Sequence, residues 1–274
     1  MSGNPRGCTG PLAMRRSWPN ARQMKISAIA ISGLGLAALA TGCGKEERAL
    51  AEERPAQPAM VERQPVEPPL VATEVPVPGD RPAFVVTGPL GACPRMVFLH
   101  GMCGHGLGYV QAFTRTAREH GGVLGLQGDV PCGADRVFSK YSPDVDEQDG
   151  RIRNALAACG GEAEDLVVIG YSQGAYLAER LAERWPERYS RLVLLGAPTT
   201  PSAARLRDIR GAVMISGELD ATYRMKEGAR GLLAANIPAV YREMPGAHHG
   251  ALPDAERVMD EALDWLDANA RPRP

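Results

Sequence analysis

The sequence predicts an α/β domain with a doubly wound, mostly parallel sheet and no large cap domain. Short apolar runs alternate with amphipathic segments from residue 83 to residue 274, as in a parallel sheet covered by helices. Most of the runs lack polar alternation, which indicates strands buried on both faces. Only sixteen residues separate the run ending at Leu195 from the run beginning at Ala212, which leaves no room there for a large insertion.

The strands are expected at short runs of three to five residues that are mostly apolar and often β-branched. The first of them, residues 84–86, is the shortest, and the run at 166–169 is wholly apolar. In order along the chain, strands are expected at residues 84–86, 96–99, 123–127, 166–169, 192–195, 212–216 and 240–244.

The helices are expected where apolar residues recur every three or four positions. Gly121-Gly122, Gly160-Gly161 and Pro186 end three of these segments, because glycine and proline terminate helices. In order along the chain, helices are expected at residues 107–119, 145–159, 175–185, 225–235 and 253–269.

Residues 1–42 are interpreted as a targeting segment. An uncharged apolar stretch, residues 26–40, follows Lys25 and is shorter than the roughly 20 residues that span a bilayer as a helix. A basic region followed by a short apolar region is typical of a secretory signal. Met24 is better placed than Met1 as the start of such a signal.

The end of this segment, Leu39-Ala40-Thr41-Gly42-Cys43, resembles the lipobox of bacterial lipoproteins. The resemblance implies that Cys43 is lipidated and that the protein is exported and anchored to the cell envelope, on the periplasmic or outer-membrane face. Contact with a membrane would then be through the lipid anchor only. A plain signal peptide, which would leave the protein secreted, and a membrane-tethering helix are the alternatives.

Residues 43–82 are expected to be a disordered linker. The stretch from Gly44 to Pro82 holds eight prolines and many Glu and Arg residues but no aromatic residue. Such a chain cannot bury enough apolar area to offset the entropy lost on ordering. The folded α/β domain is therefore expected in residues 83–274.

The overall composition argues against several classes of partner. The formal net charge is −1 and aromatic residues make up 5% of the chain, so neither a nucleic-acid partner nor a base-stacking surface is expected. No CxxC spacing and no glycine-rich phosphate loop is present. No metal site and no cofactor are expected, and the oligomeric state is left open.

Ser172 is the candidate nucleophile. Gly170-Tyr171-Ser172-Gln173-Gly174 follows an apolar strand and opens a helix, which is the context that the G-x-S-x-G pattern requires. The turn would leave the serine hydroxyl exposed at the carboxyl end of the strand. The alternative is a serine that only caps the helix.

On these residues the chain resembles the α/β-hydrolase superfamily, over about residues 83–270, and within it the small carboxylesterase and dienelactone-hydrolase-like branch. In that superfamily the acid and the base follow the serine in the order Asp or Glu, then His. The resemblance maps a G-x-x-D turn onto Gly217–Asp220, which makes Asp220 the acid, with Glu218 as runner-up. It makes His249 the base, with His248 as the alternative.

An oxyanion hole is expected beside the serine. His100-Gly101-Met102 follows an early strand and resembles the superfamily's oxyanion loop. The resemblance implies that the backbone N–H groups of Met102 and Gln173 stabilise the developing oxyanion. His100 is expected to brace the loop. Residues 131–144, the longest irregular stretch, are expected to form a substrate wall, with Phe138, Tyr141 and Tyr223 as candidate wall residues.

Four cysteines follow Cys43, an even number that suggests two disulfides in an exported domain. Three pairings of Cys93, Cys103, Cys132 and Cys159 are possible. A Cys103–Cys132 bond is attractive because it would join the oxyanion loop to the expected wall.

These residues together predict a serine hydrolase that acts on a small-molecule carboxylic ester through Ser172, His249 and Asp220. A peptidase or an acyl transferase on the same fold is the first alternative, because the fold and the triad do not set specificity. A non-catalytic binding module is the second.

Overall fold

The computed structural model describes residues 70–134 and 136–273, so the expected signal segment and Cys43 lie outside the described residues. Among the described helices, none is long and apolar enough to cross a bilayer. The strands are β1 (Thr73–Val75), β2 (Ala83–Thr87), β3 (Met96–Leu99), β4 (Gly122–Leu126), β5 (Val130–Cys132), β6 (Phe138–Lys140), β7 (Val167–Tyr171), β8 (Arg191–Leu195), β9 (Gly211–Gly217) and β10 (Ala239–Met244). The α-helices are α1 (Gly106–Val110), α2 (Thr114–Glu119), α3 (Val145–Ala158), α4 (Gln173–Arg184), α5 (Thr222–Ala234) and α6 (Ala255–Asn269).

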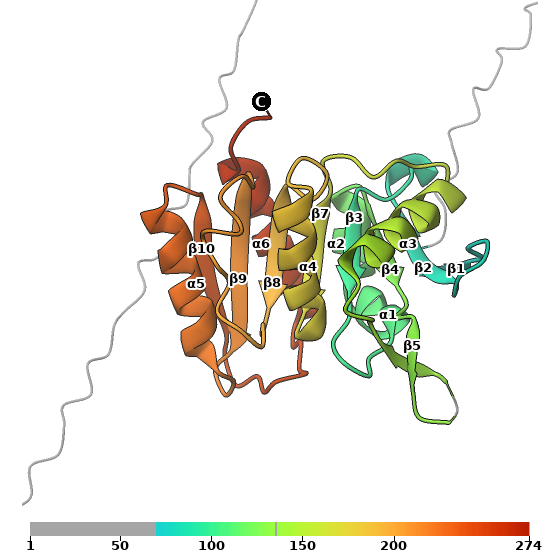
Figure 1. Cartoon of the computed structure of the whole chain (residues 1–274), viewed down its shortest axis with the longest axis horizontal. Coiled ribbons are helices and arrows are strands. Elements are labelled where there is room, and N and C mark those ends of the chain that lie inside the picture. Colours follow the sequence, from blue (N-terminus) through green and yellow to red (C-terminus); the bar gives the residue numbers. More distant parts are fainter. Residues whose placement is uncertain (1–69, 135, 274) are drawn as a thin grey trace, which may run out of the picture. The chain divides into compact units, whose positions relative to one another are not determined.

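Eight of these strands form one sheet, in the order β1-β2-β4-β3-β7-β8-β9-β10 (Figure 1). From β4 to β10 the neighbouring strands are parallel, and only β1 and β2 run antiparallel to their neighbours. The central strands β3, β7, β8 and β9 are almost wholly buried, as expected for a sheet covered on both faces.

Helices cover both faces of the sheet and divide the core into two layers. α3, α4 and α5 pack on one face around a cluster that includes Leu99, Val168 and Leu194 (Figure 1). α1, α2 and α6 pack on the other face, around Phe98 and Ile169. Alternate residues of one strand thus belong to opposite layers, which is the side-chain periodicity of a strand. The expected doubly wound α/β fold is confirmed.

Three features differ from the expectation. The chain enters the sheet earlier than residue 83, because β1 pairs with β2 and Val77 is buried in the core. The expected irregular stretch from residue 131 contains an antiparallel hairpin, β5–β6, in which Val130 lies opposite Lys140. The expected helix at 107–119 is broken at Phe113, whose backbone (φ −140°, ψ 42°) is not helical. Between β8 and β9, as expected, residues 196–210 form turns and no inserted domain.

One of the two expected disulfides is present. Cys103 and Cys132 are bonded across 29 residues of sequence. Cys93 and Cys159 are free thiols, which corrects the expectation of a second bond. The two residues are neighbours, but the Cys93 thiol donates a hydrogen bond to the backbone carbonyl of Cys159. Burial raises the pKa of the Cys159 thiol, so this side chain stays protonated at neutral pH.

Candidate active site

Ser172 lies on a sharp turn between β7 and α4. Its backbone has φ 51° and ψ −112°, a conformation that a non-glycine residue rarely adopts. The flanking glycines make this turn possible. A Cβ at Gly170 would lie 2.4 Å from the carbonyl oxygen of Gly174, and a Cβ at Gly174 would lie 2.0 Å from that of Leu99. Both approaches are sterically impossible for a larger residue, which explains the pattern G-x-S-x-G physically.

The Ser172 hydroxyl lies next to His249 rather than capping the helix. Its side chain makes no capping hydrogen bond, and Oγ lies 3.1 Å from Nε2 of His249. Nδ1 of His249 lies 2.7 Å from Oδ2 of Asp220. Because a carboxylate only accepts, Nδ1 carries the proton, which leaves Nε2 free to accept the serine proton. His248 is exposed, and its ring has no hydrogen-bond partner among the described residues.

Asp220 is held in the turn after β9. The second carboxylate oxygen, Oδ1, accepts the N–H of Ala221 at 2.6 Å, and the side chain is only 16% exposed. Glu218, the runner-up acid, makes a different contact. Its carboxylate accepts the N–H of Gly246 at 2.8 Å, in the loop that carries His249. Glu218 therefore joins the two loops but does not touch the imidazole.

The acid loop and the histidine loop also pair through their backbones. The N–H of Leu219 donates to the carbonyl of Ala247 at 3.0 Å. At Gly217 the two chains approach so closely that a Cβ would lie 2.2 Å from the same carbonyl oxygen. These contacts fix which residue of the His248-His249 pair faces Asp220.

The Asp220→Asn variant is expected to lower kcat for ester hydrolysis by about 10⁴-fold. The amide can donate to Nδ1, which would favour the wrong imidazole tautomer and would no longer stabilise the imidazolium. Glu218→Gln is the matched control, because the amide oxygen can still accept the Gly246 N–H. Steady-state kinetics on a p-nitrophenyl ester measures both. Equal losses in the two variants would contradict the assignment of Asp220.

The expected oxyanion loop lies against the serine turn. A Cβ at Gly101 would lie 3.3 Å from Cβ of Ser172, so the loop and the nucleophile are in direct contact. Within the described part of the chain, the backbone N–H groups of Met102 and Gln173 donate no hydrogen bond. They are therefore free to donate to an oxyanion on the carbon that Ser172 attacks. Cys103, which follows, has a positive φ of 52° that turns the chain away.

His100 braces this loop from inside the protein, as expected. Its Nδ1 lies 2.7 Å from the carbonyl oxygen of Gly101, and its Nε2 accepts the N–H of Gly128 at 2.9 Å. The ring is fully buried and lies beside Tyr141, whose hydroxyl donates to the carbonyl of Leu126. Burial lowers the pKa of His100 from 6.5 to about 4, so the imidazole is neutral in the folded protein.

This buried histidine is expected to make stability depend on pH. Between about pH 6.5 and pH 4 the unfolded chain binds a proton that the folded protein does not, so stability falls as the pH falls through this window. The full contribution is about 3 kcal/mol, from about 1.4 kcal/mol per pKa unit. Urea unfolding at pH 7 and pH 4.5 measures it. The free energy of unfolding should change less with pH in His100→Gln than in the parent, and an equal change would contradict this origin.

The β5–β6 hairpin is joined to the site at three points. The Cys103–Cys132 disulfide links it to the oxyanion loop, and the N–H of Ser139 donates to the carbonyl of Gly104 at 3.1 Å. The Gln173 side chain makes two hydrogen bonds with the backbone of Tyr141, at 3.1 and 3.2 Å. Gln173, whose backbone N–H is expected to stabilise the oxyanion, thus also positions the wall through its side-chain amide.

Two of the candidate wall residues lie at the protein surface. Phe138 and Tyr223 are 49% and 55% exposed, whereas Tyr141 is buried with its hydroxyl directed into the core. Tyr171 is a contact that the sequence did not reveal. Its hydroxyl accepts the N–H of Gly250, and its ring lies 5.3 Å from that of His249. No local pattern marks Tyr171 for this role, because it stands at the variable position of G-x-S-x-G.

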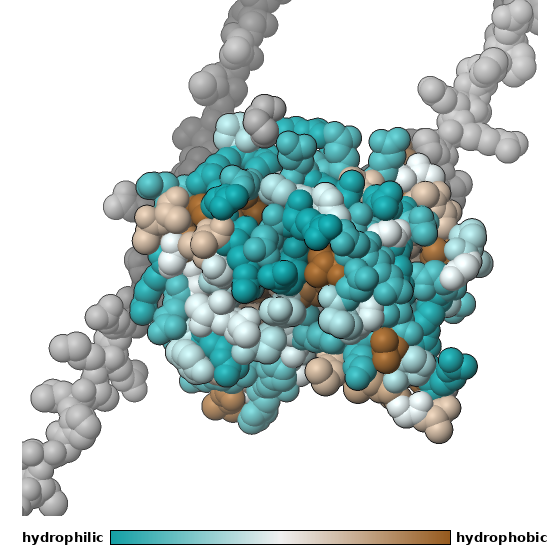
Figure 2. Space-filling model, in the orientation of Figure 1, coloured by the Kyte–Doolittle hydropathy of each residue, from teal (hydrophilic) through white to brown (hydrophobic). Residues whose placement is uncertain are grey.

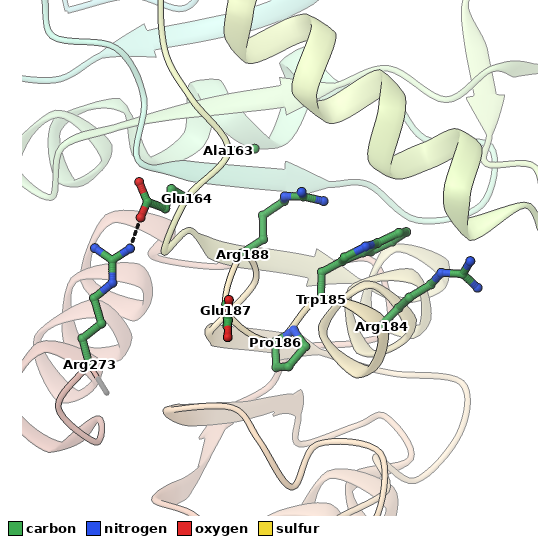
Figure 3. Close-up of a pocket in the computed structure, with 8 residues that line it drawn as sticks. All are labelled: Ala163, Glu164, Arg184, Trp185, Pro186, Glu187, Arg188 and Arg273. Atoms are coloured by element: carbon green, nitrogen blue, oxygen red, sulfur yellow. Dashed lines mark hydrogen bonds and ion pairs between the residues drawn. The ribbon is translucent and has the colours of Figure 1, made fainter.

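A cleft of about 440 Å³ begins at Met102 and Gln173. A second hollow, of about 450 Å³, lies at the opposite edge of the sheet, beside the amino ends of β7 and β8 (Figure 3). There Trp185 stands between two arginines (Figure 3). Each arginine of this hollow already pairs with a carboxylate of the chain: Arg184 with Asp146, Arg188 with Asp149 and Arg273 with Glu164. The hollow therefore has no spare positive charge for a ligand.

Among residues 70–134 and 136–273, no group of His, Cys, Asp or Glu side chains is arranged to hold a metal ion.

Comparison with known proteins places this fold among solved structures. No protein-family model matches the sequence, and no curated protein matches it. The Staphylococcus aureus fluorophosphonate-binding serine hydrolase FphF has a TM-score of 0.54 at 15% identity, over 72% of this chain and 97% of its own. VinJ gives 0.53 at 17% identity, over 74% and 100%. Esterase PE8 gives 0.52 at 17% identity, over 72% and 100%. The protein therefore has the α/β-hydrolase fold, which these solved structures share.

Proposed function

We propose that this protein is a serine hydrolase that cleaves carboxylic esters. The observation that carries the proposal is the chain of contacts from Ser172 Oγ to His249 Nε2 at 3.1 Å and from His249 Nδ1 to Asp220 Oδ2 at 2.7 Å. The strained turn at Ser172 supports it, since backbone strain of this kind is concentrated at functional sites. The esterases and serine hydrolases among the structures of the same fold support it further.

The reaction would proceed in two steps through an acyl-enzyme. Ser172 Oγ attacks the ester carbonyl while His249 Nε2 takes the hydroxyl proton, and Asp220 stabilises the imidazolium. The N–H groups of Met102 and Gln173 would hold the oxyanion, where two fixed donors contribute several kcal/mol to the barrier. The C–O bond of the ester then breaks, and His249 returns the proton to the departing alcohol. Water releases the acid in the second step by the same proton route.

The absence of an inserted domain favours a small ester over a lipid aggregate. Residues 196–210 form turns, and the His249 side chain is 49% exposed, so the described part of the chain leaves the base open to solvent.

We also propose that the enzyme works outside the cytoplasm, anchored through Cys43. The Cys103–Cys132 disulfide supports export, because such bonds persist in oxidising compartments.

Reaction with a fluorophosphonate probe tests the proposal. The protein should form a covalent adduct, and peptide mapping should place it on Ser172. It should also turn over p-nitrophenyl acetate or butyrate, with a burst of p-nitrophenol if release of the acid is slow. A folded protein that neither reacts with the probe nor hydrolyses these esters would favour a non-catalytic binding module.

A further inference from the structure

The cleft beside the candidate oxyanion hole lies on one side of the candidate active site. It lies between the start of α4, the β5–β6 hairpin and the segment that leads into α3. Met102 and Gln173, which carry the two free N–H groups, both line it. No residue of the loops that carry Asp220 and His249 lines it. Ser172 itself does not line the cleft, which therefore lies beside the nucleophile, next to Gln173 and Met102 and away from the imidazole.

This position assigns the cleft to the acyl half of the substrate, an assignment that rests on the proposed esterase function. His249 must give its proton to the alcohol oxygen, so the alcohol half lies on the side of the imidazole. The carbonyl oxygen lies between the donor N–H groups. The acyl chain therefore extends away from the imidazole, on the side of Ser172 where the cleft lies.

The inner walls of the cleft are apolar. Val130, Val145 and Leu177 line it, and Tyr176 stands at its rim. Leu177 is 5% exposed. On a face that is otherwise mostly hydrophilic, Figure 2 shows a small hydrophobic area between α4 and α3. A volume of about 440 Å³ lies in the range of small-molecule pockets, so an apolar acyl chain several carbons long fits.

The charged residues of the cleft are all cationic. Lys140 and Arg180 line it, and no Asp or Glu does. Arg180 pairs with Glu183 on the next turn of the helix at 3.0 Å. The Lys140 ammonium has no carboxylate within 4.0 Å among the described residues, so its charge is available.

The hairpin directs Lys140 toward the cleft. Lys140 and Val130 are directly opposite in the β5–β6 pair, and opposite residues place their side chains on the same face. Ser139, the preceding residue, points the other way and is buried against Gln127. The disulfide at Cys132 holds the hairpin against the oxyanion loop. The ammonium is thus attached to a braced element rather than to a free loop.

We propose that the cleft selects esters whose apolar acyl chain ends in an anionic group, and that Lys140 binds that group. Monoesters of dicarboxylic acids are substrates of this class. Hydrolysis would add water across the ester bond and release the alcohol and the free dicarboxylic acid. Lys140 is a specificity residue in this scheme and takes no part in the chemical step.

Paired substrates test the proposal on the full-length protein. The mono-p-nitrophenyl esters of adipic and suberic acid are compared with their methyl-capped diesters, which have the same chain length and no charge. In the parent, kcat/KM should be about tenfold higher for the charged ester, because a hydrogen bond to a charged group strengthens binding by about that factor. In Lys140→Met this preference should disappear, so that the ratio of kcat/KM for the charged ester to kcat/KM for the capped ester falls to about one.

The controls separate the two levels of the proposal. Arg230→Met, which removes an exposed cation from α5, should keep the parent's preference for the charged ester. In the parent, 0.5 M salt should weaken that preference, because salt screens the charge of Lys140. If the parent hydrolyses charged and capped esters equally, or if Lys140→Met keeps the preference, the selection by Lys140 is overturned and the esterase stands. If neither ester is hydrolysed and the fluorophosphonate leaves Ser172 unmodified, the esterase itself is overturned.

Discussion

Replacing His249 by alanine is expected to lower kcat for p-nitrophenyl butyrate by about 10⁴-fold or more, whereas His248→Ala should stay within about twofold of the parent. The two residues are adjacent in sequence, but only the His249 ring lies 3.1 Å from the Ser172 hydroxyl. Without it the serine loses the base that takes its proton, and the leaving alcohol loses the acid that protonates it. The His248 ring is exposed and makes no hydrogen bond with a described residue, so its loss removes no contact.

Kinetics and probe labelling measure this difference together. The rate of fluorophosphonate labelling should fall in His249→Ala and stay unchanged in His248→Ala. Urea unfolding of both variants is the control for folding, since both rings are at the surface and neither substitution should cost much stability. Equal activity in the two variants, or a larger loss in His248→Ala, would reverse the assignment of the base.

A single methyl group added at Gly174 is expected to destabilise the protein by about 3 kcal/mol or more and to abolish ester hydrolysis. The new Cβ would lie 2.0 Å from the carbonyl oxygen of Leu99 and 2.8 Å from that of His100. Both are backbone atoms of the strand and loop beside Ser172, so neither can move aside without moving the oxyanion loop. The serine turn and the expected N–H donors would separate.

Gly150→Ala is the matched control for this substitution. Gly150 is also a helical glycine, in α3, but the nearest atom to an added Cβ is the end of the flexible Arg153 side chain, at 4.0 Å. Alanine is favoured over glycine in helices by roughly 0.5–1 kcal/mol, so this variant should be slightly more stable than the parent. Urea unfolding compares the three proteins. Parent-like stability of Gly174→Ala would show that the backbone can yield at the serine turn.

The parts of the fold that the sequence predicted are those that local chemistry determines. Apolar runs such as residues 166–169 are strands because a strand buried on both faces has no polar alternation. The glycines around Ser172 reveal the turn because no other residue fits there. The proximity of Ser172, Asp220 and His249 was predicted from a resemblance, and the parallel sheet explains it, since all three follow the carboxyl ends of strands.

The remaining features depend on contacts between distant residues. β1 has two exposed residues, so only its pairing with β2 identifies it as a strand. The β5–β6 hairpin has no turn signal strong enough to stand out, and it is held by a disulfide and by Gln127. The state of Cys93 and Cys159 depends on where one thiol points. The choice between His248 and His249 likewise depends on the pairing of two loops, which no single loop sequence contains.

The three candidate catalytic residues are not held to one another equally, because the acid loop and the histidine loop contact each other directly. Glu218 and the Leu219 N–H both fasten the turn after β9 to the turn after β10. Asp220 and His249 are thus joined loop to loop, whereas Ser172 stands on a different turn, fixed by Gly170 and Gly174, which contacts the histidine loop through Tyr171. Warming or a distant substitution is therefore expected to change mainly the distance between the Ser172 hydroxyl and Nε2 of His249. The temperature dependence of the turnover rate would then depend on how rigidly β9 and β10 pack against β7 and β8.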